Sequence, residues 1–219
     1  MAEEKKHQLP LWQESILLVA TALVLALIVK TFLFQAFYIP SDSMVPTMIQ
    51  DDKLLVQKWS YWGDEPERGD IVVFRDPGNW LGAMDSGGQS NAVQRALEVV
   101  GLFPSGGHLI KRVVGIGGDT VACCDDDGRL TVNDAPIDEP YLADQEANAE
   151  QEFSIEVPQG YLWVMGDNRG NSADSRAHMG EPGGGFISED DVVGKAWLRV
   201  WPMDRFGLID GTDAFDEVP

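Results

Sequence analysis

One long apolar run limits what this chain can fold into more than any other feature. Residues 15–38 carry a single charge, Lys30, and otherwise only Ser, Thr and Gln interrupt the apolar side chains. A helix of this length spans roughly 36 Å, and about 30 Å is enough to cross the hydrocarbon core of a bilayer. Trp12 before the run, with Phe37 and Tyr38 at its end, suits the aromatic belts of the two interfaces. The pattern predicts a transmembrane anchor over 15–38.

A cleaved secretory signal is the alternative for the same run, because Lys5 and Lys6 precede it. No small-x-small cleavage site follows convincingly, since bulky Phe34 lies two positions before Ala36. The interpretation adopted is therefore an uncleaved anchor. No second apolar run of comparable length appears, so a single crossing is expected. Lys5 and Lys6 favour a cytoplasmic segment 1–14, although three later lysines weaken that bias: Lys30, Lys53 and Lys58.

The charge of the chain lies almost entirely beyond the apolar run. Lys and Arg number 16 against 36 Asp and Glu, a formal net charge of -20, while residues 1–40 sum to zero. Nucleic acid is disfavoured as a partner, because its phosphates attract basic surfaces. With 44% hydrophobic residues, the chain is not disordered throughout.

After Pro40, short Val/Ile/Leu-rich runs alternate with Gly, Pro and Asp turns, which is typical of antiparallel β structure. The segment 125–129 (DDDGR) is expected to be a hairpin turn, because its acids lack the alternate spacing of a calcium loop. The expected strands are 53–58, 71–74, 109–115, 119–124, 129–132, 153–157, 161–165 and 192–201.

Three further segments have their own character. Residues 76–108 interrupt the strand pattern, and within them 91–103 has the apolar spacing of an amphipathic helix. Residues 117–156 carry twelve acidic residues and one basic residue, which indicates an acidic, solvated lobe. The tail from Asp204 is acidic and is expected to be frayed.

The two cysteines, Cys123 and Cys124, are adjacent and suit neither a disulfide framework nor a zinc site. Small thiols buried in a strand are favoured over a strained vicinal disulfide.

Four segments draw attention as chemistry: 39–48 (IPSDSMVPTM), 67–74 (ERGDIVVF), 109–121 (LIKRVVGIGGDTV) and 164–176 (VMGDNRGNSADSR). Each alone has an ordinary structural explanation, such as a Ser-Pro turn, a strand lysine reaching water or a polar loop. The Arg-Gly-Asp tripeptide at 68–70 suggests adhesion, but a turn entering the strand at 71 is the better interpretation.

A Ser-His-Asp triad is poorly supported, because no histidine is well placed among His7, His108 and His178. A serine can instead be activated by a lysine that is desolvated enough to be neutral near pH 7. Lys111 has the apolar flanks that this requires, whereas Arg112 points to the opposite face, where it can stay solvated or paired. Ser43 lies in a Pro-bounded turn that can present its hydroxyl.

In combination and in this order after an apolar span, the four segments resemble the sequence boxes of bacterial type I signal peptidases. Those enzymes are membrane-anchored Ser/Lys endopeptidases that remove signal peptides from exported preproteins after small-x-small sites. The resemblance covers residues 11–201, and it is weaker in 76–108, in the acidic lobe and in the tail. The single span and the acidic excess resemble Gram-positive, actinobacterial members.

The resemblance implies that Ser43 is the nucleophile and Lys111 the general base. Ser41 would add a hydroxyl to an oxyanion hole beside the backbone N–H of Ser43. Ser172 would hydrogen-bond Lys111 and hold its amine toward Ser43. Asp42 departs from the family, where Gly is frequent, and we expect its carboxylate to face solvent, away from the oxyanion.

The same resemblance assigns supporting roles. Asp174 and Arg176 would form an ion pair behind the site, and Gly166 would allow close approach at its edge. Shallow apolar pockets for small substrate side chains would be formed by Phe37, Ile39, Met44 and Ile110.

The implied organisation is mainly β: a single N-terminal transmembrane helix, then an extracytoplasmic antiparallel β-sheet catalytic domain with an inserted acidic β lobe. Its expected parts are a cytoplasmic segment 1–14, the anchor 15–38, a catalytic core 39–116 and 157–203 with the insertion 76–108, the lobe 117–156 and the tail 204–219.

No cofactor or metal is implied. The implied partners are signal peptides, membrane lipid and a nearby secretion translocon, with the chain in the cell membrane, its N-terminus cytoplasmic and its catalytic domain outside. Aromatic side chains expected to help seat that domain on lipid include Phe32, Phe34, Phe37, Trp59, Trp62 and Trp80. Two alternatives remain: a Ser/Lys peptidase of the self-cleaving repressor type, and a membrane-tethered β domain that binds ligands without catalysis. A serine-directed activity test separates the latter from a peptidase.

Overall fold

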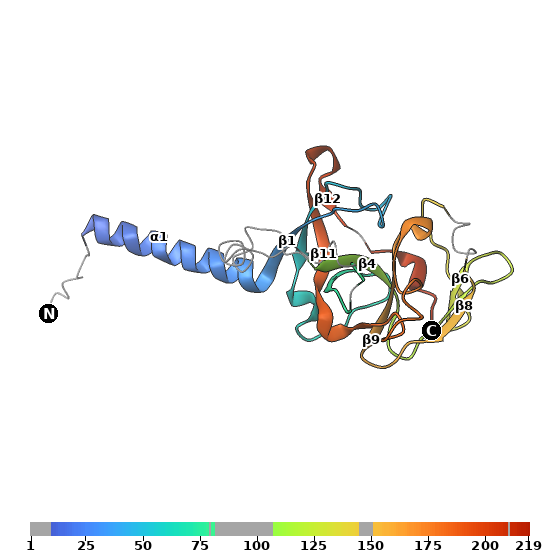
Figure 1. Cartoon of the computed structure of the whole chain (residues 1–219). Coiled ribbons are helices and arrows are strands. Elements are labelled where there is room, and N and C mark those ends of the chain that lie inside the picture. The colour runs from blue at the N-terminus through green and yellow to red at the C-terminus, as the bar shows by residue number, and fades with distance from the viewer. Residues whose placement is uncertain (1–9, 79, 82–106, 145–150, 210) are drawn as a thin grey trace.

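The computed structural model describes residues 10–78, 80–81, 107–144, 151–209 and 211–219. The amphipathic helix expected at 91–103 therefore lies outside the described residues. A long helix projects from a β domain that contains two antiparallel sheets (Figure 1).

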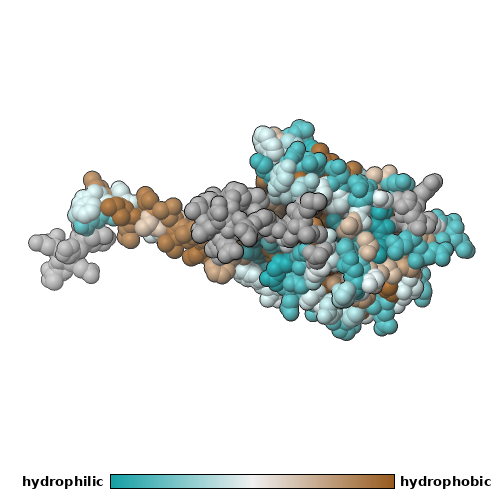
Figure 2. Space-filling model, viewed as in Figure 1, coloured by the Kyte–Doolittle hydropathy of each residue, from teal (hydrophilic) through white to brown (hydrophobic). Residues whose placement is uncertain are grey.

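The projecting helix, α1, runs from Leu11 to Ile28, and a π-helical turn, Val29–Leu33, continues it. None of its side chains is buried, and the helix is long and apolar enough to cross a membrane. Figure 2 shows its apolar surface beside a largely polar face of the β domain.

The helical structure ends before the apolar run does, which corrects the expected span of 15–38. Strand β1, Phe34–Tyr38, instead pairs with β2, Lys53–Gln57, in antiparallel register. The ring of Phe34 packs against Trp59 and Trp197, with centroids 4.6 and 5.6 Å away. Sheet pairing and aromatic packing thus draw these five residues into the β domain.

The larger sheet has eight strands in the order β1-β2-β11-β3-β4-β9-β10, with β12 attached to β11. Every expected strand of this sheet is confirmed, and β1, β10 and β12 were not expected. The remaining bounds are β3 Ile71–Arg75, β4 His108–Gly115, β9 Tyr161–Met165, β10 Ile187–Ser188, β11 Val192–Trp201 and β12 Gly207–Leu208.

The smaller sheet lies in the acidic lobe, in the order β7-β6-β5-β8. Its turn at 125–129 is the expected hairpin, where the Asp125 N–H donates to the Arg129 carbonyl over 2.9 Å. The strands are β5 Thr120–Cys123, β6 Leu130–Val132, β7 Ala135–Pro136 and β8 Phe153–Glu156. Buried Val121, Leu130 and Phe153 join Trp163 and Met165 of β9 in one core, so lobe and main sheet share their packing.

Cys123 and Cys124 form a disulfide in this lobe, so the expectation of free thiols is wrong. That expectation was based on burial in a strand, but burial does not prevent two adjacent cysteines from forming a bond.

The tail is packed, which corrects the expectation that it frays. Phe215 is only 6% exposed and belongs to the core shared with Trp163. Arg68 donates hydrogen bonds to the carbonyls of Val218 and Pro219, 3.3 and 3.2 Å away. One buried ring and these bonds are enough to hold the acidic segment against the domain.

The Arg-Gly-Asp tripeptide is internal and enters a strand, as expected. Arg68 forms an ion pair with Asp119, 2.6 Å away, and buried Asp70 accepts from the Tyr61 hydroxyl over 2.8 Å. Gly69 has a φ of 87°, a left-handed conformation that glycine adopts easily, and β3 begins two residues later.

Candidate active site

The loop between β1 and β2 presents Ser43 from a closed turn. The Ile39 N–H donates to the Asp52 carbonyl, and the Asp51 N–H returns to the Ile39 carbonyl, each over 3.0 Å. Ser43 is 8% exposed, and its own carbonyl accepts from the Asn168 N–H over 3.0 Å. The backbone on both sides of this serine is therefore held in place.

Lys111 lies on β4, between β3 and β9, and is 4% exposed. Its Nζ donates to Ser43 Oγ over 2.7 Å and to the Ile110 carbonyl over 3.0 Å. The structure thus brings together the two residues that the sequence predicts as nucleophile and base, 68 positions apart. At this distance, an amine that has lost its proton is placed to accept the serine proton.

Burial lowers the pKa of Lys111 from 10.5 to about 8. Water stabilises an ammonium ion strongly, so the loss of hydration disfavours the charged form. The carboxylates of Asp174 and Asp167 act in the opposite direction and offset only part of this effect.

Ser41 and Asp42 are both exposed, as expected for Asp42. The hydroxyl of Ser41 lies 3.4 Å from Ser43 Oγ, and its expected place in an oxyanion hole stays a prediction. The Asp42 carbonyl accepts from the Asn168 side-chain amide over 2.9 Å, which ties the loop to the segment after β9.

Gly166 follows β9 and packs directly against the loop that carries Ser43. A Cβ at this position would overlap the Ser43 carbonyl oxygen and the Ser172 hydroxyl, so only glycine permits the approach. The Ser172 hydroxyl is thus close to the site, but the described residues show no hydrogen bond from it to Lys111. The expected contact is therefore absent: the Lys111 amine contacts Ser43 Oγ and the carbonyl of its own neighbour, Ile110.

The four expected pocket residues share one apolar cluster, which includes Met44, the residue after Ser43. Phe37, Ile39, Met44 and Ile110 are each 8% exposed or less and pack with Leu54, Val56, Ile71 and Val73. Their contribution to substrate selection stays a prediction.

The expected ion pair between Asp174 and Arg176 is present, with nitrogen and oxygen 2.9 Å apart. Asp174 also accepts from the Gly166 N–H over 3.0 Å. Burial alone would raise the pKa of Asp174, but the Arg176 guanidinium and these hydrogen bonds outweigh burial and lower it.

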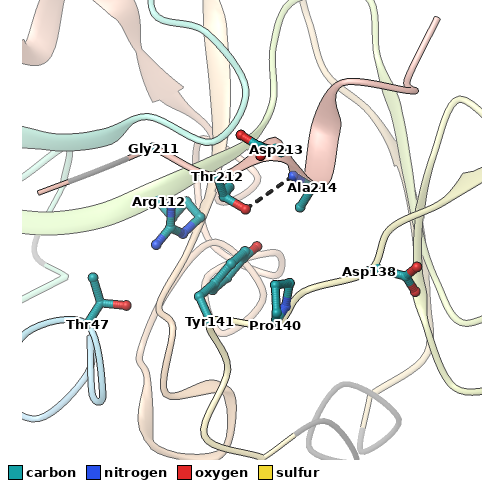
Figure 3. A pocket seen from close by; sticks show the side chains of 9 residues that line it. All are labelled: Thr47, Arg112, Asp138, Pro140, Tyr141, Gly211, Thr212, Asp213 and Ala214. Atoms are coloured by element: carbon teal, nitrogen blue, oxygen red, sulfur yellow. Dashed lines mark hydrogen bonds between the residues drawn. The ribbon is translucent and has the colours of Figure 1, made fainter.

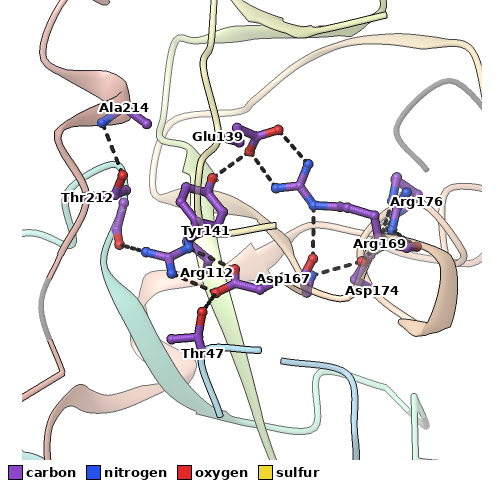
Figure 4. Close-up of polar contacts among 12 residues, drawn as sticks. Thr47, Arg112, Glu139, Tyr141, Asp167, Arg169, Asp174, Arg176, Thr212 and Ala214 are labelled. Atoms are coloured by element: carbon purple, nitrogen blue, oxygen red, sulfur yellow. Dashed lines mark hydrogen bonds and ion pairs between the residues drawn. The ribbon is translucent and has the colours of Figure 1, made fainter. Parts of the chain in front are cut away.

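Two further buried ion pairs were not predicted from the sequence. Arg112 is 2% exposed and pairs with Asp167 over 2.6 Å, so it is paired rather than solvated. Arg169 pairs with Glu139 of the acidic lobe over 2.6 Å. Figure 4 shows Tyr141 between the two pairs, with its hydroxyl on Glu139 and its ring against Arg112, while Thr47 donates to Asp167 alone. No local sequence pattern indicated either pair, because the two residues of each pair are far apart in the sequence.

A cavity of about 620 Å³ lies elsewhere, between the acidic lobe and the tail (Figure 3). Its lining includes Arg112, Tyr141 and Thr212, and the Arg112 guanidinium lies 4.0 Å from the Tyr141 ring centroid. Because neighbouring strand residues face opposite sides, this cavity and Lys111 lie on different faces of β4.

Comparisons with a family model and with known proteins all indicate the same family. A family model described as "Signal peptidase, peptidase S26" matches residues 12–201. "Probable signal peptidase I" of Mycobacterium leprae (strain TN) is 39% identical, covering 96% of this chain and 83% of the relative. "Signal peptidase I" of Mycobacterium tuberculosis (strain ATCC 25618 / H37Rv) is also 39% identical, covering 90% and 75%. "Signal peptidase I U" of Bacillus subtilis (strain 168) is 31% identical, covering 87% and 89%. The chain therefore belongs to the peptidase S26 family and is a bacterial type I signal peptidase, a serine endopeptidase.

Proposed function

We propose that this chain removes signal peptides from exported preproteins with Ser43 as the nucleophile and Lys111 as the general base. The observation that carries this assignment is the 2.7 Å contact between Lys111 Nζ and Ser43 Oγ, both in buried residues. The lowered pKa of Lys111 supports it, because a base must be neutral to accept a proton.

In this mechanism, neutral Lys111 takes the proton of the Ser43 hydroxyl as Oγ attacks the scissile carbonyl. The Ser43 N–H and the Ser41 hydroxyl stabilise the oxyanion of the tetrahedral intermediate. Lys111 then returns the proton to the leaving amine, and the mature protein departs. Water, deprotonated by Lys111, hydrolyses the remaining ester and releases the signal peptide with a free carboxylate.

The apolar cluster of Phe37, Ile39, Met44 and Ile110 supports a preference for Ala, Gly or Ser immediately before the cut. A bulky side chain there would displace packed groups, which costs about 1–3 kcal/mol or more. Cleavage rates of one preprotein with Ala or Phe at that position measure the preference. Equal rates would contradict the assignment of these residues to the pocket.

For the membrane arrangement, we propose that α1 crosses once, with residues 1–14 in the cytoplasm and the β domain outside, near the translocon. Exposed apolar side chains support seating on lipid: Trp59, Trp62, Trp201, Met203, Phe206 and Leu208. Phe37 and Trp80, also expected there, are not part of this surface, because Phe37 is buried and the Trp80 ring stacks on His178 at 4.3 Å. The net charge of -20 gives no attraction to anionic lipid, so the seating must be apolar.

Cleavage of a preprotein, with the cut position determined by mass spectrometry, tests the catalytic assignment. Ser43→Ala and Lys111→Ala should each abolish cleavage and keep the fold. Ser154→Ala is the matched control, because Ser154 is an exposed residue of β8 in the acidic lobe. Cleavage by Ser43→Ala at the wild-type rate would disprove the assignment.

The topology is tested with protease added to intact, wall-stripped cells. The β domain should be degraded while a tag on the N-terminus survives. Protection of the β domain would overturn the proposed orientation.

A further inference from the structure

Arg169 is a fully buried cation directly behind the candidate active site. Its side chain is 0% exposed, and its Nε donates to the Gly166 carbonyl over 2.9 Å. Its two terminal nitrogens donate to the two carboxylate oxygens of Glu139, over 2.9 and 2.6 Å. The guanidinium therefore has a bidentate partner on one side and a backbone carbonyl on the other (Figure 4).

Glu139 belongs to the inserted acidic lobe, between β7 and β8. Its side chain is 1% exposed, and the Tyr141 hydroxyl donates to its Oε1 over 2.5 Å. The ring of Tyr141 in turn lies against the guanidinium of Arg112 on β4. The lobe thus contributes a buried carboxylate that is anchored against the catalytic sheet.

The segment 166–169 contacts the backbone of the nucleophile. The Asn168 N–H donates to the Ser43 carbonyl over 3.0 Å, and its side-chain amide donates to the Asp42 carbonyl over 2.9 Å. Gly166 packs so closely on the Ser43 carbonyl that no Cβ fits between them. A change in the path of 166–169 would therefore move Ser43.

We propose that Glu139 is a positioning residue, through which the inserted lobe orients Arg169 and so holds the 166–169 segment against Ser43. The proposal rests on the assigned role of Ser43. A carboxylate that accepts two parallel N–H bonds fixes the plane of a guanidinium as well as neutralising it. That plane directs Nε of Arg169 at the Gly166 carbonyl, so the contact is lost if the plane rotates.

The first test compares E139Q with D138N in the full-length enzyme. Both changes remove one negative charge from adjacent positions, but the side chain of Asp138 is 85% exposed. Because small displacements of catalytic groups are costly, we expect kcat of E139Q to fall about tenfold or more with KM unchanged. D138N should match the wild type in both constants. Equal kcat values for the two variants would overturn the proposal.

A second variant, E139L/R169M, separates positioning from stability. Replacing a buried ion pair with apolar side chains of similar size is often neutral or stabilising, so this variant is expected to fold. It lacks the donor to the Gly166 carbonyl, so we expect a lowered kcat in an enzyme that still unfolds cooperatively well above the assay temperature. A wild-type kcat would show that the pair acts only in stability, and would refute the positioning role. The proposal would also be refuted if, in both variants, the loss of activity were fully accounted for by a smaller fraction of folded protein.

Ser43→Ala is measured in parallel to keep the two proposals apart. Cleavage by Ser43→Ala refutes the catalytic assignment and with it the positioning role. Inactive Ser43→Ala together with fully active E139Q refutes the positioning role alone.

Discussion

Protonation of Lys111 should set the acid side of the pH profile. With an ordinary pKa of 10.5, about one lysine in 3,000 is neutral at pH 7, but with a pKa of about 8 the fraction is about one in eleven. Burial thus supplies roughly 300 times more neutral base, equivalent to about 3 kcal/mol. Because the protonated amine cannot accept a proton, kcat/KM should fall about tenfold per pH unit below about pH 8 and level off above it.

A fluorogenic peptide with Ala at the two specificity positions serves as the substrate, at concentrations far below KM. Rates are measured from about pH 5.5 to about pH 10, and Tm at each pH shows that the enzyme stays folded. The control K53M removes an exposed lysine of β2 and should leave the profile unchanged. K111R should be inactive, because a guanidinium keeps its proton throughout this range. A plateau that continues down to about pH 6, or an active K111R, would refute the reasoning.

Three further changes test the energetics. The pKa of Lys111 is about 8 in the folded state and 10.5 in the unfolded state, so between these values the unfolded state binds more protons and the wild type gains stability as pH rises. K111M has no such group and should be more stable than the wild type at pH 7. In urea unfolding, this difference in free energy should shrink by about 2.5 kcal/mol from pH 7 to pH 10. G166A places a Cβ against the nucleophile's carbonyl and should lower kcat about a hundredfold, whereas G180A, with no atom within 4 Å, should not. F215A empties a buried site and should cost about 3–5 kcal/mol in unfolding free energy, whereas the exposed Phe206 can be replaced by Ala within about 0.5 kcal/mol.

The strands that carry the site were predictable because their side-chain pattern is local. The segment around Lys111 has the pattern of a buried strand interrupted by two cations, and the structure places the first of them against Ser43. Strand β1 was missed because its five residues carry no charge and follow the apolar helix without a break. Pairing with β2 distinguishes this strand from the helix, and the sequence of one segment does not reveal that pairing.

The supporting charges were mostly unpredictable for the same reason. Asp174 and Arg176 are two residues apart, and their pairing followed from the motif. Glu139 is one of twelve acidic residues in the lobe, and nothing near it in the sequence marks it as the buried partner of Arg169. The fold decides which cation a carboxylate pairs with. From the sequence alone, Glu139 was therefore counted among the solvated acidic residues of the lobe.

The direct passage from helix to sheet limits how far the enzyme can reach. The π-helical turn ends at Leu33, β1 begins at Phe34, and the Lys58 N–H donates to the Leu33 carbonyl over 2.9 Å. No linker separates the apolar helix from the sheet, so Ser43, on the loop after β1, is held at a fixed height above the end of that helix. If α1 crosses the membrane and Ser43 is the nucleophile, as proposed, a substrate must present its scissile bond at that height. Distance along the membrane normal then becomes a selection criterion independent of side-chain identity. Insertion of a flexible segment between residues 33 and 34 would replace this fixed height with a range of heights.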